Sequence, residues 1–335
     1  MAYTTIDNPE LYFQTVIWTG NGTAIGSGGL AVTFDGDEDM APNLVWIKGR
    51  STTYSHQIYD PNRGATKRIF SDITTAEETD TEALTAFGSD GFTLGSNAGV
   101  NTSSGTHVAW CWNESADAGF DIVTYTGNTT SGQTYSHSLS VTPNLMMVRC
   151  RNNADNFMVY HHKTASDPET DYVQLNTNAA IGDSAGIWND TAPTSSVFTL
   201  GNSGTVNENY NYVAYLFAEK KGFSKFGSFV SDGQTDGNFV WTGFRPALVM
   251  IKRNAARDWV IHDNKRDGYN GSNENLHPNL TNAEGSGENF MDLCANGFKV
   301  RSDDGTLTSG GDLILYMAWA EAPFVNSKGV PGNAR

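Results

Sequence analysis

"PNLVWIK" occupies residues 42–48, and two near copies follow it along the chain, "PNLMMVR" at 143–149 and "PALVMIK" at 246–252. Each copy opens with proline, which has no N–H to donate and therefore suits the first position of a strand. The apolar run that follows is typical of a buried strand. The closing Lys48, Arg149 or Lys252 is expected to bring the strand back out to water. The heptad therefore predicts a core strand, and its return at intervals of roughly 100 residues predicts an internal repeat.

Four further markers recur in the same order. They are "VIWTGNG" (16–22), "VTYTGNT" (123–129) and "GSFVSDG" (227–233); "HQIYD" (56–60), "FMVYHH" (157–162) and "DWVIHD" (258–263); "SDGFTLGS" (89–96), "SSVFTLGN" (195–202) and "ANGFKVRS" (295–302); and "HVAWCW" (107–112), "YVAYLF" (212–217) and "YMAWAE" (316–321). A unit of about 100 residues is large enough to own a hydrophobic core. We therefore expect three repeats, as tandem domains or as lobes of one body, between a short arm and a tail. The expected bounds are 1–10 for the arm, 11–118, 119–221 and 222–325 for the repeats, and 326–335 for the tail.

Composition and alternation favour an all-β fold. The chain has 335 residues, 35 of them glycine, and most segments alternate polar and apolar residues between Gly, Asn-Gly or Ser-Gly turns. Short strands at regular spacing predict three tandem antiparallel β-sandwich, jelly-roll-like repeats. Residues 75–87 are the one stretch expected to form a short surface helix, or a loop with a helical turn. Aromatic side chains of the last strands are assigned mainly to the core: Trp110, Trp112, Tyr215, Phe217 and Trp319.

The net charge limits the partners of this chain. A formal charge of −16 argues against nucleic-acid binding and against anionic membrane surfaces. No run of 18 apolar residues predicts a membrane span, so no membrane insertion is expected. The first residues, "MAYTTIDNPELYF", lack the layout of a signal peptide. We therefore expect a protein that is made and folded in a cytosol.

Cysteine and histidine spacing predicts no zinc site. Cys111, Cys150 and Cys294 are odd in number and do not recur at equivalent repeat positions, so free buried thiols are expected in place of disulfides. His161 and His162 are adjacent at a strand end, where their side chains should point to opposite faces of the sheet. One buried and one exposed imidazole is the favoured interpretation.

The sequence contains no GxSxG, P-loop, HExxH or dinucleotide-binding motif, so a non-enzymatic protein without a cofactor is expected. Asp35, Asp37 and Asp39 have the 1-3-5 spacing of a calcium loop. However, Met40 replaces the required glycine and Trp46 the required glutamate, so a solvated hairpin tip is favoured and no metal is predicted.

Aromatic residues in irregular segments are the better candidates for ligand binding. They are Tyr54, Tyr59, Trp188, Trp259 and Tyr269, all in or next to stretches rich in Gly, Asn, Asp and Ser. Loops carry binding function more often than strands do. A sugar ring can lie on an aromatic face while amides and carboxylates meet its hydroxyls. The alternatives are ordinary exposed aromatics, or residues of a subunit interface.

Together the segments "YFQTVIWTGNG", "PNLVWIKGRS", "HQIYDPNRGATKRIFSD", "FGSDGFTLGS" and "VAWCW" resemble a repeated domain in virion proteins of tailed, mostly marine, bacteriophages. The ending "YMAWAEAPFVNSKGVPGNAR" is similar to the ending of many such proteins. The resemblance covers essentially the whole chain and is best in the first repeat. It implies a virion surface component, usually described as fibre-like, and it implies no catalytic residues.

Three functions follow as expectations. The first is a tail-fibre or adhesin-like virion protein for host-surface recognition, with a glycan as ligand, although the chain contains no fibre shaft. The second is a capsid decoration or head-fibre protein without a receptor site, docked through "MAYTTIDNPELYF". The third, least favoured, is a polysaccharide hydrolase, which would need two carboxylates in a cleft. Expected partners are other virion proteins and further copies of this chain, with a trimer favoured because linked weak sites gain avidity.

Overall fold

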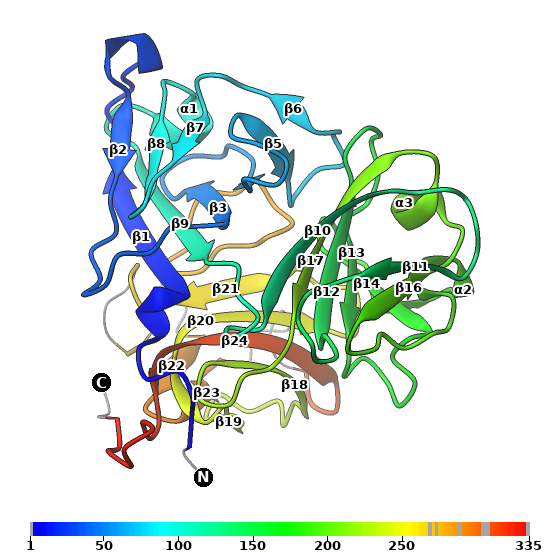
Figure 1. The fold of residues 1–335 in the computed structure, drawn as a ribbon. Helices are drawn as coiled ribbons and strands as arrows, with labels where there is room; N and C mark the ends of the chain where they lie inside the picture. The colour runs from blue at the N-terminus through cyan, green and yellow to red at the C-terminus, as the bar shows by residue number, and fades with distance from the viewer. Residues whose placement is uncertain (1–2, 267–269, 272–273, 287–289, 303–308, 333–335) are drawn as a thin grey trace.

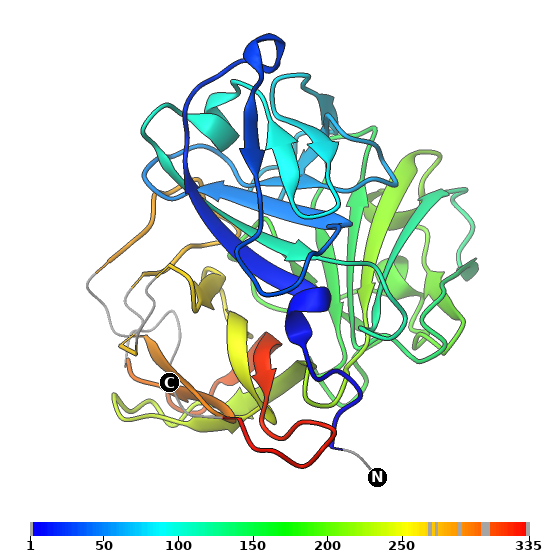
Figure 2. The same cartoon turned by 60° about the vertical axis from the view of Figure 1, so that its left-hand side comes forward.

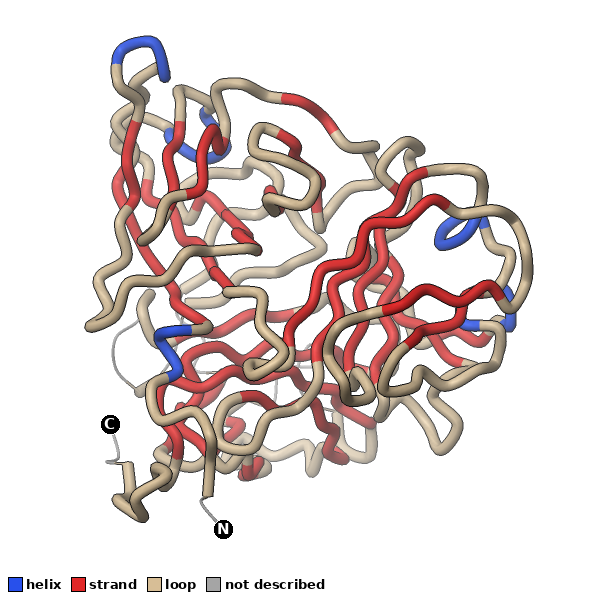
Figure 3. Tube along the Cα trace, in the orientation of Figure 1, coloured by secondary structure: helices blue, strands red, loops and turns tan. Residues whose placement is uncertain are grey.

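The computed structural model describes residues 3–266, 270–271, 274–286, 290–302 and 309–332. Strands dominate this part of the chain, and the few helices are single turns (Figure 3). The strands form six sheets, all with antiparallel pairing. The predicted all-β class is therefore confirmed.

The first third of the chain, here called lobe 1, builds one large and one small sheet (Figure 1). The large sheet has the order β1-β9-β3-β4-β5-β6, and the small sheet has the order β2-β8-β7. The elements are η1 (Pro9–Leu11), β1 (Phe13–Thr19), η2 (Ile25–Ser27), β2 (Leu30–Val32), β3 (Leu44–Gly49), β4 (Gln57–Tyr59), β5 (Lys67–Phe70), β6 (Glu78–Thr79), β7 (Leu84–Phe87), β8 (Phe92–Leu94), α1 (Ala98–Asn101) and β9 (Thr106–Trp112).

Lobe 2 repeats this arrangement, with the sheet orders β10-β17-β12-β13-β14-β15 and β11-β16. Its elements are β10 (Phe120–Thr126), β11 (Gln133–Ser136), β12 (Leu145–Cys150), β13 (Met158–His161), β14 (Asp171–Gln174), β15 (Gly182–Asp183), α2 (Ala185–Trp188), β16 (Val197–Leu200), α3 (Gly204–Asn207) and β17 (Asn211–Phe217).

Lobe 3 has the sheet orders β18-β24-β20-β21 and β19-β23-β22. Its elements are β18 (Ser224–Val230), β19 (Phe239–Trp241), β20 (Phe244–Arg253), β21 (Val260–Asp263), β22 (Met291–Cys294), β23 (Gly297–Val300) and β24 (Leu313–Pro323). In every lobe the large sheet runs from the first strand to the last, then to the heptad strand and the strand after it. The recurring sequence markers therefore correspond to a recurring strand order.

Each heptad strand is buried on both faces; in lobes 1 and 2 the two faces enter different cores, whereas in lobe 3 both faces of β20 belong to the shared core. In β3, Val45 and Ile47 belong to a core between the two sheets of lobe 1. Leu44 and Trp46 point the other way, into a core to which all three lobes contribute. A strand with two buried faces is apolar throughout, which is why the heptad shows no alternation. The three lobes are thus parts of one body around a shared core (Figure 2).

Aromatic rings of the last strands meet at the centre of the shared core. The ring centroids of Trp112, Phe217 and Trp319 lie 6.1, 5.2 and 5.5 Å apart, each ring in contact with the other two. Trp110 and Tyr215 are buried in the same core. The assignment of these five aromatics to the core is confirmed.

The strand register corrects one predicted alignment. Trp112, Phe217 and Trp319 each pair with the first leucine of the heptad in their own lobe. The third copy of the last-strand marker is therefore "ILYMAW" at 314–319, and the predicted copy at 316–321 is displaced by two residues. A shift of two keeps every side chain on its face of the sheet, so alternation alone could not reveal it.

The closing cation of each heptad is buried, contrary to prediction. The Lys48 ammonium donates to the carbonyl oxygens of Gly49, Thr52, Tyr54 and Thr281. Carbonyl acceptors from the following loop replace water, and burial lowers the pKa of Lys48 to about 8, which leaves it protonated at neutral pH. The other two cations are buried in the same way: Arg149 donates to Ile73, Thr75 and Asp155, and Lys252 to Arg253, Ala255 and Arg257.

The helix expected at 75–87 is not formed. This segment contains β6 and β7, which pair with β5 and β8. Glu78 accepts from Arg68 across the β5–β6 pair at 2.7 Å, and Glu77 reaches Arg151 of lobe 2 at 2.9 Å. These tertiary contacts outweigh a weak local preference for helix.

The cysteines are free thiols, as expected. Cys111 and Cys150 are buried, whereas Cys294 is partly exposed. Across the residues that the structure describes, no helix is long and apolar enough to cross a membrane.

Candidate functional site

Three of the predicted ligand-binding aromatics lie inside the protein. Tyr59, Trp188 and Trp259 are almost completely buried. Trp188 Nε1 donates to Asp171 O and Trp259 Nε1 to Gln174 O, each at 2.9 Å, so their polar edges are satisfied internally. The prediction that these three rings face a ligand is wrong, because polar sequence neighbours do not report the direction of a side chain.

Tyr269 lies outside the described residues, and Tyr54 is exposed. Tyr54 is 47% exposed and lines a shallow groove on lobe 1 of about 220 Å³. The Arg68 guanidinium lies 5.4 Å from the ring centroid of Phe70 in this groove and is paired with Glu78. We call it the Tyr54 groove, lined by Tyr54, Ser55, Gln57, Arg68, Phe70, Asn97, Ala98 and Gly99.

A second, larger groove of about 360 Å³ lies on lobe 3, beside both ends of the described chain. We call it the Tyr3–Trp241 groove. Trp241 is 44% exposed, and its ring meets Phe324 edge to face at 5.3 Å. The lining residues are Tyr3, Glu219, Lys221, Ser224, Lys225, Trp241, Thr242 and Gly243. The groove therefore places an accessible indole beside ammonium and carboxylate groups.

The N-terminal segment builds one wall of this groove. Tyr3 Oη donates to Gly243 O at 2.9 Å, and the Lys221 ammonium lies 4.4 Å from the Tyr3 ring centroid. Gly243 has φ +88°, and a Cβ there would lie 2.7 Å from Tyr3 Oη. Further along, the Asp7 carboxylate accepts the Ser327 N–H at 2.6 Å. The arm expected at 1–10 therefore packs on lobe 3 through Tyr3 and on the C-terminal segment through Asp7.

Lobe 3 differs from the other lobes in β19, the strand that supplies Trp241 to this groove. Phe239 and Trp241 point outward from β19 on either side of a buried valine, and Phe239 is 48% exposed. The outward positions that correspond to them in the other lobes hold small residues: Ala31 and Thr33 in lobe 1, and Thr134 and Ser136 in lobe 2. Two large aromatics where the other copies have small residues were the sequence signal that could have identified this site.

The calcium candidates do not form a site. Asp35 is 64% exposed in its side chain and pairs with Lys265 of lobe 3 at 2.9 Å. Within the described ranges, no three His, Cys, Asp or Glu side chains gather in a way that could hold a metal ion.

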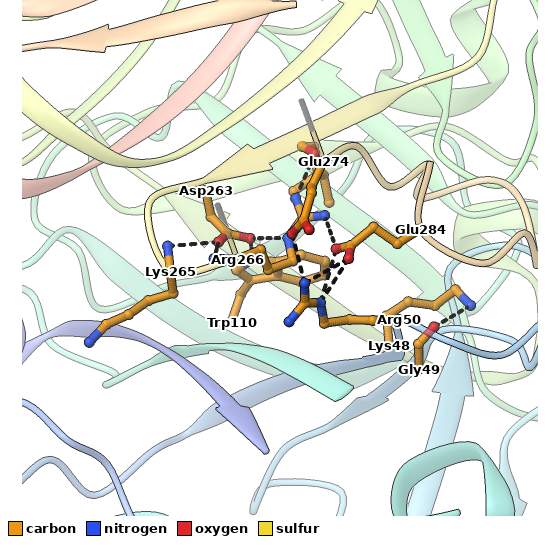
Figure 4. A network of polar contacts seen from close by, with 10 residues as sticks. Lys48, Gly49, Arg50, Trp110, Asp263, Lys265, Arg266, Glu274 and Glu284 are labelled. Carbon is orange, nitrogen blue, oxygen red and sulfur yellow. Dashed lines mark hydrogen bonds and ion pairs between the residues drawn. The ribbon is translucent and has the colours of Figure 1, made fainter. Parts of the chain in front are cut away.

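Buried ionic networks join the lobes. At the contact of lobes 1 and 3, the 1–3 junction, Arg266 pairs with Asp263 at 2.6 Å and with Glu284 at 2.8 Å (Figure 4). Glu284 also pairs with Arg50 of lobe 1 at 2.7 Å. Asp263 accepts the indole N–H of Trp110 at 2.9 Å, and although burial favours the protonated acid, Arg266 keeps the pKa of Asp263 below its usual value.

The contact of lobes 1 and 2, the 1–2 junction, repeats this network. Arg63 pairs with Asp60 at 2.5 Å and with Glu77 at 3.2 Å. Glu77 pairs with Arg151 of lobe 2, and Asp60 accepts the Tyr215 hydroxyl at 2.7 Å. Each charged group of this network is paired with an opposite charge, so the network joins the two lobes.

Glu114 and Asp121 are a neighbouring pair of carboxyl groups, the kind of pair that a polysaccharide hydrolase needs. Burial and, secondarily, the neighbouring Asp121 raise the pKa of Glu114 to about 7. Glu114 accepts the Ile122 N–H at 2.9 Å, and Asp121 accepts the Ser138 N–H. Glu114 thus fixes the start of β10 and Asp121 the loop after β11, and neither lines the Tyr54 groove or the Tyr3–Trp241 groove.

Comparison with known proteins gives a family without an assigned activity. The profile of a family described as Domain of unknown function (DUF7483) matches residues 8–323, so the chain belongs to that family. No curated protein matches the sequence.

Proposed function

We propose that this member of the DUF7483 family is a non-enzymatic surface-recognition protein of a tailed-phage virion, and that it binds a saccharide in the Tyr3–Trp241 groove. The virion setting rests on the sequence resemblance alone. The observation that carries the binding proposal is the exposed Trp241 of the groove, which with Phe239 makes β19 the one copy of this strand with two large exposed aromatics.

The groove offers the two kinds of contact that a sugar uses. The C–H face of a pyranose ring can pack on the Trp241 indole, whose other edge is fixed by Phe324. Lys221 and Lys225 supply ammonium groups along the wall, and Glu219 supplies a carboxylate, whereas the Thr242 and Ser224 hydroxyls are buried and bonded to the backbone. Small-molecule sites combine apolar faces with a few polar groups in this way.

The test is binding of the full chain to a printed array of bacterial surface polysaccharides, with Trp241→Ala as the critical variant. Tyr54→Ala is the matched control, because Tyr54 is an equally exposed aromatic in the other groove. Stacking contacts of this kind contribute about 1–1.5 kcal/mol, so we expect Trp241→Ala to weaken binding roughly tenfold and Tyr54→Ala to leave it unchanged. Equal binding by wild type and Trp241→Ala would refute the proposal.

Capsid decoration is the second candidate. It is favoured by the three lobes that close around one core, as the subunits of a trimer do. Immunogold labelling of intact virions with antibody to this chain separates the two. Gold on the tail supports recognition, and gold over the head supports decoration.

A further inference from the structure

The charge around the Tyr3–Trp241 groove is opposite in sign to the charge of the whole chain. The chain carries a formal net charge of −16. The connection from β17 into β18 nevertheless contains Lys220 and Lys221, and Lys225 follows on β18. Lys221 and Lys225 both line the groove. A local cationic site on an acidic protein concentrates anions at that site alone.

The corresponding connection between lobes 1 and 2 is acidic. In both connections a glutamate, Glu114 or Glu219, accepts the backbone N–H of the third residue of the following strand, at 2.9 and 2.8 Å. Asp121 and Lys225 are the residues directly before those N–H donors in the sequence, so they occupy the same position in the two copies. The copy beside the groove therefore has a basic residue at the strand position where the lobe 1–lobe 2 copy has an acidic one.

The two ammonium groups flank the aromatic surface. The Lys221 ammonium lies over the Tyr3 ring, and Lys225 Nζ donates to Trp241 O at 2.8 Å. Glu219, the one acidic group of the lining, directs a carboxylate oxygen to the β18 backbone. An ammonium has three N–H donors, so the Trp241 carbonyl takes only part of the capacity of Lys225.

From this arrangement we propose that the ligand is an anionic saccharide, whose ring packs on Trp241 and whose carboxylate or sulfate group meets Lys221 and Lys225. This inference rests on the proposed function, since it specifies the ligand of the same groove. A single aromatic face selects sugars poorly, because most pyranoses present a C–H face. The two lysines supply the discrimination, since an ammonium binds an anionic oxygen more strongly than a neutral hydroxyl.

The test uses an array on which acidic bacterial polysaccharides are printed beside their methyl esters and beside sulfated polysaccharides. The methyl esters keep the sugar ring and lose the negative charge. Wild type should bind an acidic glycan at least about tenfold more tightly than its ester, and Lys221→Ala or Lys225→Ala should remove roughly that factor. Lys163→Ala, an exposed lysine of lobe 2, is the matched control and should change nothing. Thermal unfolding of each variant checks that the fold is retained.

The outcomes separate the two proposals. Equal binding of acid and ester, weakened about tenfold by Trp241→Ala, overturns the anionic ligand and leaves saccharide binding intact. Binding to nothing on the array overturns both. Preference for carboxylated or for sulfated glycans supports the inference in either case and identifies the anionic group.

Discussion

The 1–3 junction and the contact between lobes 2 and 3, the 2–3 junction, use equivalent backbone positions with different chemistry. In the first, the Glu284 N–H donates to Arg50 O at 2.8 Å, and in the second the Ile181 N–H donates to Asn254 O at 3.0 Å. The side chains around these bonds differ. Asp263, Arg266 and Glu284 form a charged network in the first, and their counterparts in the second are His161, Thr164 and Ile181.

This difference shows that the ionic network is not needed to join two lobes. The 2–3 junction closes with a neutral contact, the His161 Nε2–H to Tyr316 O at 3.3 Å, over the same shared core. Burying charges is costly, and replacing a complete buried network by apolar groups is often neutral. We infer that burial of apolar surface provides most of the free energy with which the lobes pack together. The charged groups then destabilise any arrangement of the lobes in which they lose their partners.

The largest expected effect comes from breaking the charged network. Arg266→Met should lower the free energy of unfolding by about 3–5 kcal/mol, because Asp263 and Glu284 then lose a buried partner. Thr164→Ala, at the same position of the neutral junction, removes one hydrogen bond to His161 O and should cost about 1 kcal/mol. Urea unfolding measures both. A similar loss in the two variants would contradict the comparison.

Acidic pH should destabilise the protein through His161, the buried imidazole of the 2–3 junction. Burial and then His162 lower the pKa of His161 to about 3, while Nε2–H donates to Tyr316 O and Nδ1 accepts the Lys163 N–H. The unfolded chain takes up this proton near pH 6.5, so the stabilising contribution is complete above that pH and is lost as the pH falls toward 3.

At pH 5 the loss amounts to about 2 kcal/mol from this residue. His161→Gln keeps a donor for Tyr316 O and cannot titrate. Its unfolding free energy, measured from pH 7.5 to pH 5, should therefore fall by about 2 kcal/mol less than that of wild type. Parallel pH profiles for the two proteins would show that His161 is not the titrating group.

The smallest effect should come from the rim of a charged junction. Arg151 keeps 20% of its side chain exposed beside Glu77, and partly solvated pairs contribute about 0.2–1 kcal/mol. Arg151→Asn copies the residue of the 2–3 junction, where Asn254 stands. We expect a loss of at most about 1 kcal/mol in urea unfolding, reduced further in high salt. A loss as large as that of Arg266→Met would show that exposure does not rank these pairs.

The sequence was sufficient for the repeat, the all-β class and the core strands, because a buried strand must be apolar in every copy. The sequence did not reveal that the cation at the end of each heptad is buried. Lys48 is buried because loop carbonyls, including Thr281 from another lobe, surround its ammonium, and no local pattern reports such long-range acceptors.

The candidate site was largely missed for a similar reason. Trp188 and Trp259 lie next to polar residues in the sequence but turn inward, whereas Tyr3 and Trp241 come from segments about 240 residues apart. Only a comparison of the three copies, position by position, distinguishes Phe239 and Trp241 from ordinary strand residues. That comparison requires the register, which the strand pairings supply.

The shared core also has a consequence for the order of synthesis. Trp112 leaves the ribosome well before Trp319, the ring that covers it, and at ordinary elongation rates of about 5–20 residues per second the interval is on the order of 10–40 seconds. During that time the nascent lobe 1 presents the inward face of its large sheet, Leu44 and Trp46 included, to the cell. The central aromatic rings are therefore the surface on which a ribosome-bound chaperone would be expected to act.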